Sequence, residues 1–170
     1  TDMLEAVISA AEELRSPVII GTAEVLLPYG ELKLLAPSIV AAAKRATVPV
    51  VVHYDHGLTP EKTIEAMDLG FSSVMFDAST LPYGENVAAT ASIVKLAHSR
   101  GITVEGEIGH VGQADRPDDL AENGYTTVEE AVRFQADTGV DALAVSFGTA
   151  HGVYKSKPRL QLKRLAEISA

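Results

Sequence analysis

The sequence predicts an α/β protein of the (β/α)8 barrel (TIM barrel) class, and the 170 residues cover about five central βα units of such a barrel. Five short apolar segments alternate with longer segments of helical periodicity, which is the pattern of a parallel sheet with crossover helices. The segment at residues 48–52 is apolar throughout, as in a strand covered on both faces. Polar side chains follow four different strands, and a barrel gathers such strand ends around one mouth, whereas an open sheet spreads them along an edge.

The first half of the chain begins with a helix expected at residues 3–14, where apolar side chains recur at helical spacing. A short β-branched strand follows at residues 18–20. The Leu- and Ala-rich segment 31–46 predicts a second helix, which Pro37 should kink or split. The strand at residues 48–52 then runs into a group of titratable side chains.

The middle of the chain repeats this pattern twice. A helix at residues 59–69 begins with a threonine cap and a first-turn proline, and a glycine ends it. A strand is expected at residues 73–76 and a helix at residues 86–100. A further strand begins at residues 102–104 and ends at residues 105–107.

The last part of the chain opens with a long polar stretch at residues 109–125, which predicts a mobile loop of the kind that often forms a lid. A helix at residues 126–138 carries a Thr-Glu capping box. The fifth strand is expected at residues 141–147 and the final helix at residues 160–168.

Composition limits the function classes. Apolar residues make up 46% and charged residues 22%, so residues 1–170 predict one soluble globular domain, incomplete as a barrel because a barrel takes about 250 residues. The net charge of −9 and the lack of basic runs argue against a nucleic-acid partner. With no cysteine, any zinc site must use His, Asp or Glu. No apolar run is long enough for a membrane helix, so we expect no membrane association and a cytoplasmic location.

The candidate site residues lie at or just past the carboxyl ends of the predicted strands. They are Asp55, His56, Asp77, Ser79, Glu107 and His151. His56 and His151 occupy equivalent places on two strands, and each either binds zinc or lines a polar cleft. Asp55 could orient a histidine, although neighbours on a strand point to opposite faces. His53 shares a face with Asp55, and we expect it to be a hydrogen-bonded core histidine.

Two further features point to chemistry. Glu105 and Glu107 fall on one face of their strand, where burial without a cation is costly, and this favours a metal or proton-transfer role for at least one of them. Glycines frame His151 in the segment that ends at Gly152, and Lys155 follows three residues later. Such a turn suits a phosphate, and a plain tight turn is the alternative.

Four motifs in order over nearly the whole chain carry a resemblance to a known family. They are His53-Tyr54-Asp55-His56-Gly57, Phe76-Asp77-Ala78-Ser79, Val104-Glu105-Gly106-Glu107-Ile108-Gly109-His110-Val111-Gly112 and Gly148-Thr149-Ala150-His151-Gly152-Val153-Tyr154. With these motifs the chain resembles the class II, zinc-dependent ketose-bisphosphate aldolases, in particular the bacterial fructose- and tagatose-bisphosphate aldolases. The resemblance implies a (β/α)8 barrel and a homodimer or homotetramer.

The resemblance also implies roles for particular residues. His56 and His151 match two of the family's three zinc-binding histidines, and Asp55 matches the catalytic aspartate. Asp77 and Glu107 match carboxylates near the metal. The implied cofactor is Zn²⁺, with room for a second divalent or monovalent cation.

The remaining implied roles concern the substrate. Gly152 and Lys155 match positions that contact its phosphate, and Glu122 is the candidate for the acid that some members carry on a mobile loop. The implied reaction is the reversible cleavage of a ketose (bis)phosphate to dihydroxyacetone phosphate and an aldehyde. A metal-dependent barrel hydrolase and an inactive fragment that retains two metal ligands are the alternatives.

The sequence departs from the family pattern in three respects. The family's first strand and its third zinc histidine with the following phosphate loop fall outside residues 1–170, so we expect this chain to be part of a longer polypeptide. Gly21 and Ala23 stand where many members carry glutamine and serine. This last difference bears on the choice of substrate.

Overall fold

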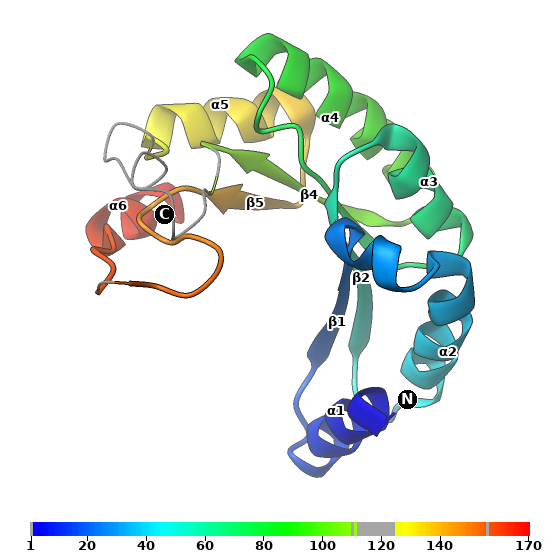
Figure 1. Ribbon diagram of the computed structural model, residues 1–170. Coiled ribbons are helices and arrows are strands. Elements are labelled where there is room, and N and C mark those ends of the chain that lie inside the picture. The colour runs from blue at the N-terminus through cyan, green and yellow to red at the C-terminus, as the bar shows by residue number, and fades with distance from the viewer. Residues whose placement is uncertain (1, 110, 112–124, 156) are drawn as a thin grey trace. The chain divides into compact units, whose positions relative to one another are not determined.

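The computed structural model describes residues 2–109, 111, 125–155 and 157–170 (Figure 1). They form two compact units, one made of Thr1–Asp77 with Lys95–Val104 and the other of Ala78–Val94 with Glu105–Ala170. Helices and strands alternate along both units, as predicted. In this described part of the chain, no helix has the length and apolar character needed to cross a lipid bilayer.

The first unit contains three parallel strands whose spatial order follows the chain. Its elements are α1 (Asp2–Glu13), β1 (Val18–Ala23), the 3₁₀ helix η1 (Glu24–Tyr29), α2 (Leu32–Arg45), β2 (Val50–Gly57), α3 (Pro60–Asp68) and β3 (Ser73–Phe76). Every residue of β3 is buried, which fits a parallel strand that is covered on both faces. Tyr54 of β2 is fully buried and meets Phe71 edge to face, with ring centroids 6.0 Å apart. This aromatic pair anchors the carboxyl half of β2 in the core.

Pro37 was expected to kink or split this segment, and the split is wrong, because α2 is one continuous helix. Pro37 is the sixth helical residue, and its missing amide deprives only the Lys33 carbonyl of a helical partner. Leu32 and Ala36 are buried on the same side of the helix, and this packing outweighs the local loss. The predicted start of α3 is confirmed, because Thr59 accepts a hydrogen bond from the Lys62 amide and Pro60 is the first helical residue.

Two features of the first unit were not predicted. Strand β1 continues to Ala23, three residues beyond the apolar segment, because its pairing with β2 extends to Ala23 opposite Asp55. The 3₁₀ helix η1 follows at once and places Glu24 next to the carboxyl end of β2, with the Glu24 carboxylate bonded to Leu58. A segment of six residues with an internal proline has no periodic signal by which to recognise such a turn.

The second unit is built around β4 and β5, which pair in parallel with Glu107 opposite Ala144. Its elements, together with those that continue from the first unit, are α4 (Tyr83–His98), β4 (Thr103–Ile108), α5 (Val128–Thr138), β5 (Ala142–Val145) and α6 (Leu162–Ile168). The predicted capping box of α5 is present, and Gly139 ends that helix in the left-handed region. Helix α4 begins three residues earlier than predicted, because the Pro82 carbonyl accepts the amides of Glu85 and Asn86.

Candidate metal and proton-transfer site

The carboxyl end of β2 departs from regular strand geometry. The pairing register between β2 and β3 shifts between Tyr54 and Gly57, and His56 has a φ of 46°. A side chain other than glycine costs roughly 1–3 kcal/mol in this left-handed region, and such strain tends to occur at functional sites. Because the bulge interrupts the alternation of faces, it turns His56 away from the direction that a regular strand imposes.

The turned ring of His56 meets Asp77, which follows β3 directly. The distance from His56 Nδ1 to Asp77 Oδ2 is 2.9 Å, and the Asp77 side chain is only 8% exposed. The carboxylate beside His56 is therefore Asp77 and not its chain neighbour Asp55. A carboxylate on Nδ1 fixes the ring and directs Nε2 outward, which is the usual arrangement behind a metal-binding histidine.

Asp55 lies on the same face of β2 as His53, as predicted. The distance from His53 Nε2 to Asp55 Oδ1 is 4.0 Å, and the Asp55 side chain is 42% exposed. The other ring nitrogen of His53 lies 2.8 Å from Ser73 Oγ, so the prediction of a hydrogen-bonded core histidine is confirmed. Burial lowers the pKa of His53, and Asp55 opposes this shift. The accessible carboxylate of Asp55 is thus held beside a buried ring and remains open to a ligand.

The Glu24 carboxylate of η1 forms hydrogen bonds with the residues that flank Asp55 and His56. Glu24 Oε2 accepts hydrogen bonds from the Tyr54 hydroxyl at 3.0 Å and from the Leu58 amide at 2.8 Å. Burial and the bond to Glu24 raise the pKa of Tyr54 well above its usual value. The residues on either side of Asp55 and His56 are therefore fastened to one oxygen.

In the second unit, Glu107 of β4 is the chemically notable residue. Its side chain is fully buried, and Oε1 accepts hydrogen bonds from Ser79 Oγ at 3.1 Å and from the Val111 amide at 2.8 Å. Asn86 Nδ2 donates to the Glu107 carbonyl at 3.0 Å, and Thr90 donates to Asn86. Strand, helix and loop thus fix the position of this carboxylate.

Gly106 shows which way the two glutamates of β4 point. A Cβ at Gly106 would lie 3.0 Å from the Phe134 ring and 3.1 Å from Val140, so this face of β4 packs against α5 and its end. Side chains alternate along a strand, so Glu105 and Glu107 point to the opposite face, away from the helices. The predicted shared face of the two carboxylates agrees with this packing.

The segment after β5 folds back on itself. Gly148 has a φ of 108°, and a Cβ there would collide with the Arg159 carbonyl oxygen. The Ala150 amide donates to the Tyr154 hydroxyl at 2.7 Å, which closes a turn around His151. His151, Gly152 and Lys155 are all exposed on this turn, as a phosphate or metal contact requires.

Some expectations concern residues outside the described part of the chain. Glu122 and His110 lie there, and so does most of the predicted lid at residues 109–125. The roles predicted for Glu122 and for that loop stay predictions.

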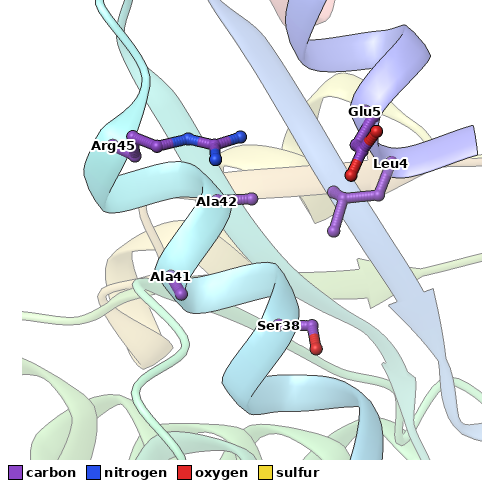
Figure 2. A pocket seen from close by; sticks show the side chains of 6 residues that line it. All are labelled: Leu4, Glu5, Ser38, Ala41, Ala42 and Arg45. Carbon is purple, nitrogen blue, oxygen red and sulfur yellow. The ribbon is translucent and has the colours of Figure 1, made fainter. Parts of the chain in front are cut away.

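A separate groove lies in the first unit between α1 and α2 (Figure 2). Its volume is about 310 Å³, and it is lined by Leu4, Glu5, Ser38, Ala41, Ala42 and Arg45. None of the predicted site residues belongs to this lining. In Figure 2 the Arg45 and Glu5 side chains extend from the two helices that form its walls.

Sequence reasoning missed Glu24, Asn86 and the role of Tyr54. Asn86 was predicted only as a helix start, and its amide instead supports the Glu107 backbone from within α4. The one available signal was a polar residue directly after a strand, which describes Glu24 as well as Asp77.

Comparison with known proteins agrees with the fold. The chain is 44% identical over 170 residues to the 6-phospho-5-dehydro-2-deoxy-D-gluconate aldolase of Shouchella clausii, covering 98% of this chain and 57% of that protein. It is 41% identical over 172 residues to a protein of Bacillus subtilis named as a probable fructose-bisphosphate aldolase, covering 98% of this chain and 60% of that protein. The chain therefore spans less than two thirds of the length of these relatives.

Solved structures of aldolases share the fold of this chain. The YdjI aldolase of Escherichia coli superimposes with a TM-score of 0.87 at 36% identity, over 99% of this chain and 59% of that one. The fructose-bisphosphate aldolase of Campylobacter jejuni gives a TM-score of 0.73 at 26% identity, over 98% of this chain and 56% of that one. The predicted fold class is confirmed, because the five βα units match part of the barrel of these aldolases. The family model for class-II fructose-bisphosphate aldolase matches residues 1–170, and the chain belongs to that family.

Proposed function

We propose that the protein containing this chain is a zinc-dependent aldolase that reversibly cleaves a ketose (bis)phosphate to dihydroxyacetone phosphate and an aldehyde. The observation that supports it best is the His56 ring held by Asp77 at a strained bulge, next to the accessible carboxylate of Asp55. This arrangement joins a metal-binding group to a proton-transfer group at one strand end. Family membership supplies the reaction class.

The donors of the chain suit zinc. Imidazole nitrogens and carboxylate oxygens are its ligands where cysteine is absent, and this chain has none. In our proposal His56 and His151 bind the metal, and Asp77 and Glu107 are the carboxylates near it. When bound, zinc supplies Lewis-acid polarisation of the substrate's ketone oxygen.

Proton transfer falls to Asp55. During cleavage its carboxylate takes the proton of the C4 hydroxyl, and during condensation it returns that proton to the aldehyde oxygen. The exposure of the Asp55 side chain allows this contact. We assign the proton transfer at the dihydroxyacetone carbon to Glu122, and we assign the contacts with the substrate phosphate to Gly152 and Lys155.

The substrate is a phosphorylated sugar derivative in this proposal. The named relatives point to two candidates, a fructose bisphosphate and 6-phospho-5-dehydro-2-deoxy-D-gluconate. Assaying the same protein with both compounds decides between them. We further propose a cytoplasmic homodimer or homotetramer, and sedimentation velocity measures its size.

The central experiment measures metal content and cleavage in the same protein. We expect His56→Ala and His151→Ala to lose bound zinc after dialysis and to lose cleavage activity, because each change removes a nitrogen donor. His98→Ala, an exposed histidine near the end of α4, is the matched control and should keep both. Stoichiometric zinc in His56→Ala or His151→Ala would show that the altered residue is not a ligand.

The product separates the aldolase from a metal-dependent hydrolase. An aldolase yields two carbonyl fragments, and in reverse it incorporates dihydroxyacetone phosphate. Release of inorganic phosphate without a carbonyl fragment would instead identify a hydrolase.

A further inference from the structure

We propose that Glu24 is a positioning residue for the metal site, because it holds the backbone that carries His56. This inference rests on the proposed function above, in which His56 binds the metal. Glu24 does not act on substrate itself. It acts through the Leu58 amide and the Tyr54 hydroxyl, which lie two residues to either side of His56.

The segment needs such a restraint because its conformation is unfavourable. His56 and Arg15 are the two residues other than glycine with positive φ in the described part of the chain. A chain released at Leu58 can relax toward ordinary strand geometry, and this relaxation would rotate the His56 side chain away from Asp77. The bond from Leu58 to Glu24 opposes that movement.

The other contacts of the segment hold different atoms from those that Glu24 holds. Gly57 is closely packed, since a Cβ there would collide with Thr63 Oγ1 and lie 2.8 Å from the Met75 carbonyl oxygen. Asp77 holds the imidazole ring. The Asp77 amide donates to the Gly57 carbonyl at 2.9 Å and so holds the residue directly after His56. The hydrogen bond from the Leu58 amide to Glu24 holds the next residue, and its acceptor belongs to η1, which follows β1.

The geometry predicts which replacement can preserve the function. One oxygen, Oε2, accepts both hydrogen bonds, and a glutamine carries a carbonyl oxygen in the same place. Glu24→Gln should therefore retain both bonds, whereas Glu24→Ala removes both. A role that depended on the negative charge would fail in both variants.

Glu12 offers a matched control in the same unit. Its Oε1 also accepts one backbone amide and one hydroxyl, those of Thr47, at 2.8 and 3.2 Å. Thr47 precedes β2, so this pair fastens the other end of the same strand. Glu12→Ala removes two bonds of the same kind without touching the bulge.

The experiment titrates Zn²⁺ into the metal-free protein and its Glu24→Ala, Glu24→Gln and Glu12→Ala variants, with circular dichroism as a check of folding. We expect Glu24→Ala to weaken zinc binding about 10-fold, as loss of outer-sphere support does in other metal sites. Glu24→Gln should bind within about twofold of the unaltered protein, since it keeps the acceptor. Glu12→Ala should bind as the unaltered protein does. Equal affinities for Glu24→Ala and Glu12→Ala would overturn the inference.

Amide hydrogen exchange tests the positioning role of Glu24 separately from the proposed zinc-dependent function. It is also informative for a variant that binds zinc poorly for reasons other than the loss of the Glu24 hydrogen bonds. If the unaltered protein binds no zinc, the proposed function fails, and exchange at residues 56–58 in the metal-free proteins still decides the inference. Faster exchange there in Glu24→Ala than in Glu12→Ala supports a positioning role. Equal exchange in the two variants contradicts it.

Discussion

The two ends of β2 are each held by a glutamate carboxylate, but they differ in the residues that they carry. At the amino end Glu12 accepts the amide and hydroxyl of Thr47, and at the carboxyl end Glu24 accepts the Leu58 amide and the Tyr54 hydroxyl. Only the carboxyl end carries a bulge, a histidine with positive φ and a carboxylate against its ring.

Under the proposed function, this difference separates stability from chemistry along one strand. In βα barrels the amino ends of the strands serve mainly stability, and the carboxyl ends hold the functional groups. Strain is acceptable at the carboxyl end because Gly57, Asp77 and Glu24 each hold one part of the distorted segment. Substitutions at the carboxyl end should therefore change cleavage activity or zinc affinity, whereas substitutions at the amino end should change only the free energy of unfolding.

The largest effect is expected at Asp55. Asp55→Ala should lower aldol cleavage by about 10²–10⁴-fold, the usual contribution of a positioned acid–base group, and leave zinc affinity nearly unchanged. Steady-state cleavage at saturating zinc measures this. Asp68→Ala, a surface carboxylate paired with Arg100, is the control and should keep full activity. Equal rates for Asp55→Ala and the unaltered protein would remove Asp55 from the mechanism.

Asp77→Asn tests the contact that distinguishes the carboxyl end. The amide can accept from His56 Nδ1 but lacks the charge that fixes and polarises the ring, so zinc affinity should fall by about 10–100-fold. Competition with a chelator of known affinity gives the value. An unchanged affinity would mean that the His56 and Asp77 pair supports the fold and not the metal.

Gly57→Ala tests the packing under the bulge. The added methyl meets Thr63 Oγ1 and the Met75 carbonyl oxygen, so the free energy of unfolding should fall by about 1–3 kcal/mol. Gly21→Ala in the neighbouring strand is the control, because a Cβ at Gly21 has no heavy atom within 4 Å. Urea denaturation compares the two, and similar losses would argue against tight packing at Gly57.

Tyr54→Phe changes how stability depends on alkaline pH. The pKa of Tyr54 is raised in the folded protein, so above about pH 10 the unfolded chain loses this proton while the folded one keeps it. The contribution of the Tyr54 hydroxyl to the free energy of unfolding is fully present below about pH 10. As the pH rises further, this contribution falls by about 1.4 kcal/mol per pH unit. Denaturation between pH 9 and 11 should show a shallower decline in Tyr54→Phe. Parallel curves would mean that Tyr54 ionises normally in the fold.

The smallest effect is expected at the amino end. Glu12→Ala removes exposed hydrogen bonds and should lower the free energy of unfolding by about 1 kcal/mol at most, with no change in zinc affinity. Chemical denaturation and the zinc titration above check both statements. A loss of zinc affinity in Glu12→Ala would erase the distinction between the two ends.

The alternation of elements was predictable because it depends on local patterns. Apolar runs, the Thr59 cap, the α5 capping box and the terminal glycines act within a few residues, and the structure confirms them. The positions of Asp55, His56, Asp77 and Glu107 after or near strand ends were predictable for the same reason. The resemblance carried by the four motifs led to the aldolase family, which the comparisons confirm.

Tertiary structure alone decided how these side chains are paired. No local pattern distinguishes Asp55 from Asp77 as the partner of His56, because the choice depends on a bulge that forms only when β2 pairs with β3. Pro37 lies inside a continuous helix because the burial of Leu32 and Ala36 outweighs one lost helical bond. Glu24 acquires its role from residues 30 and 34 positions away along the chain. Sequence patterns report short-range preferences, whereas contacts across such separations exist only after the strands have assembled.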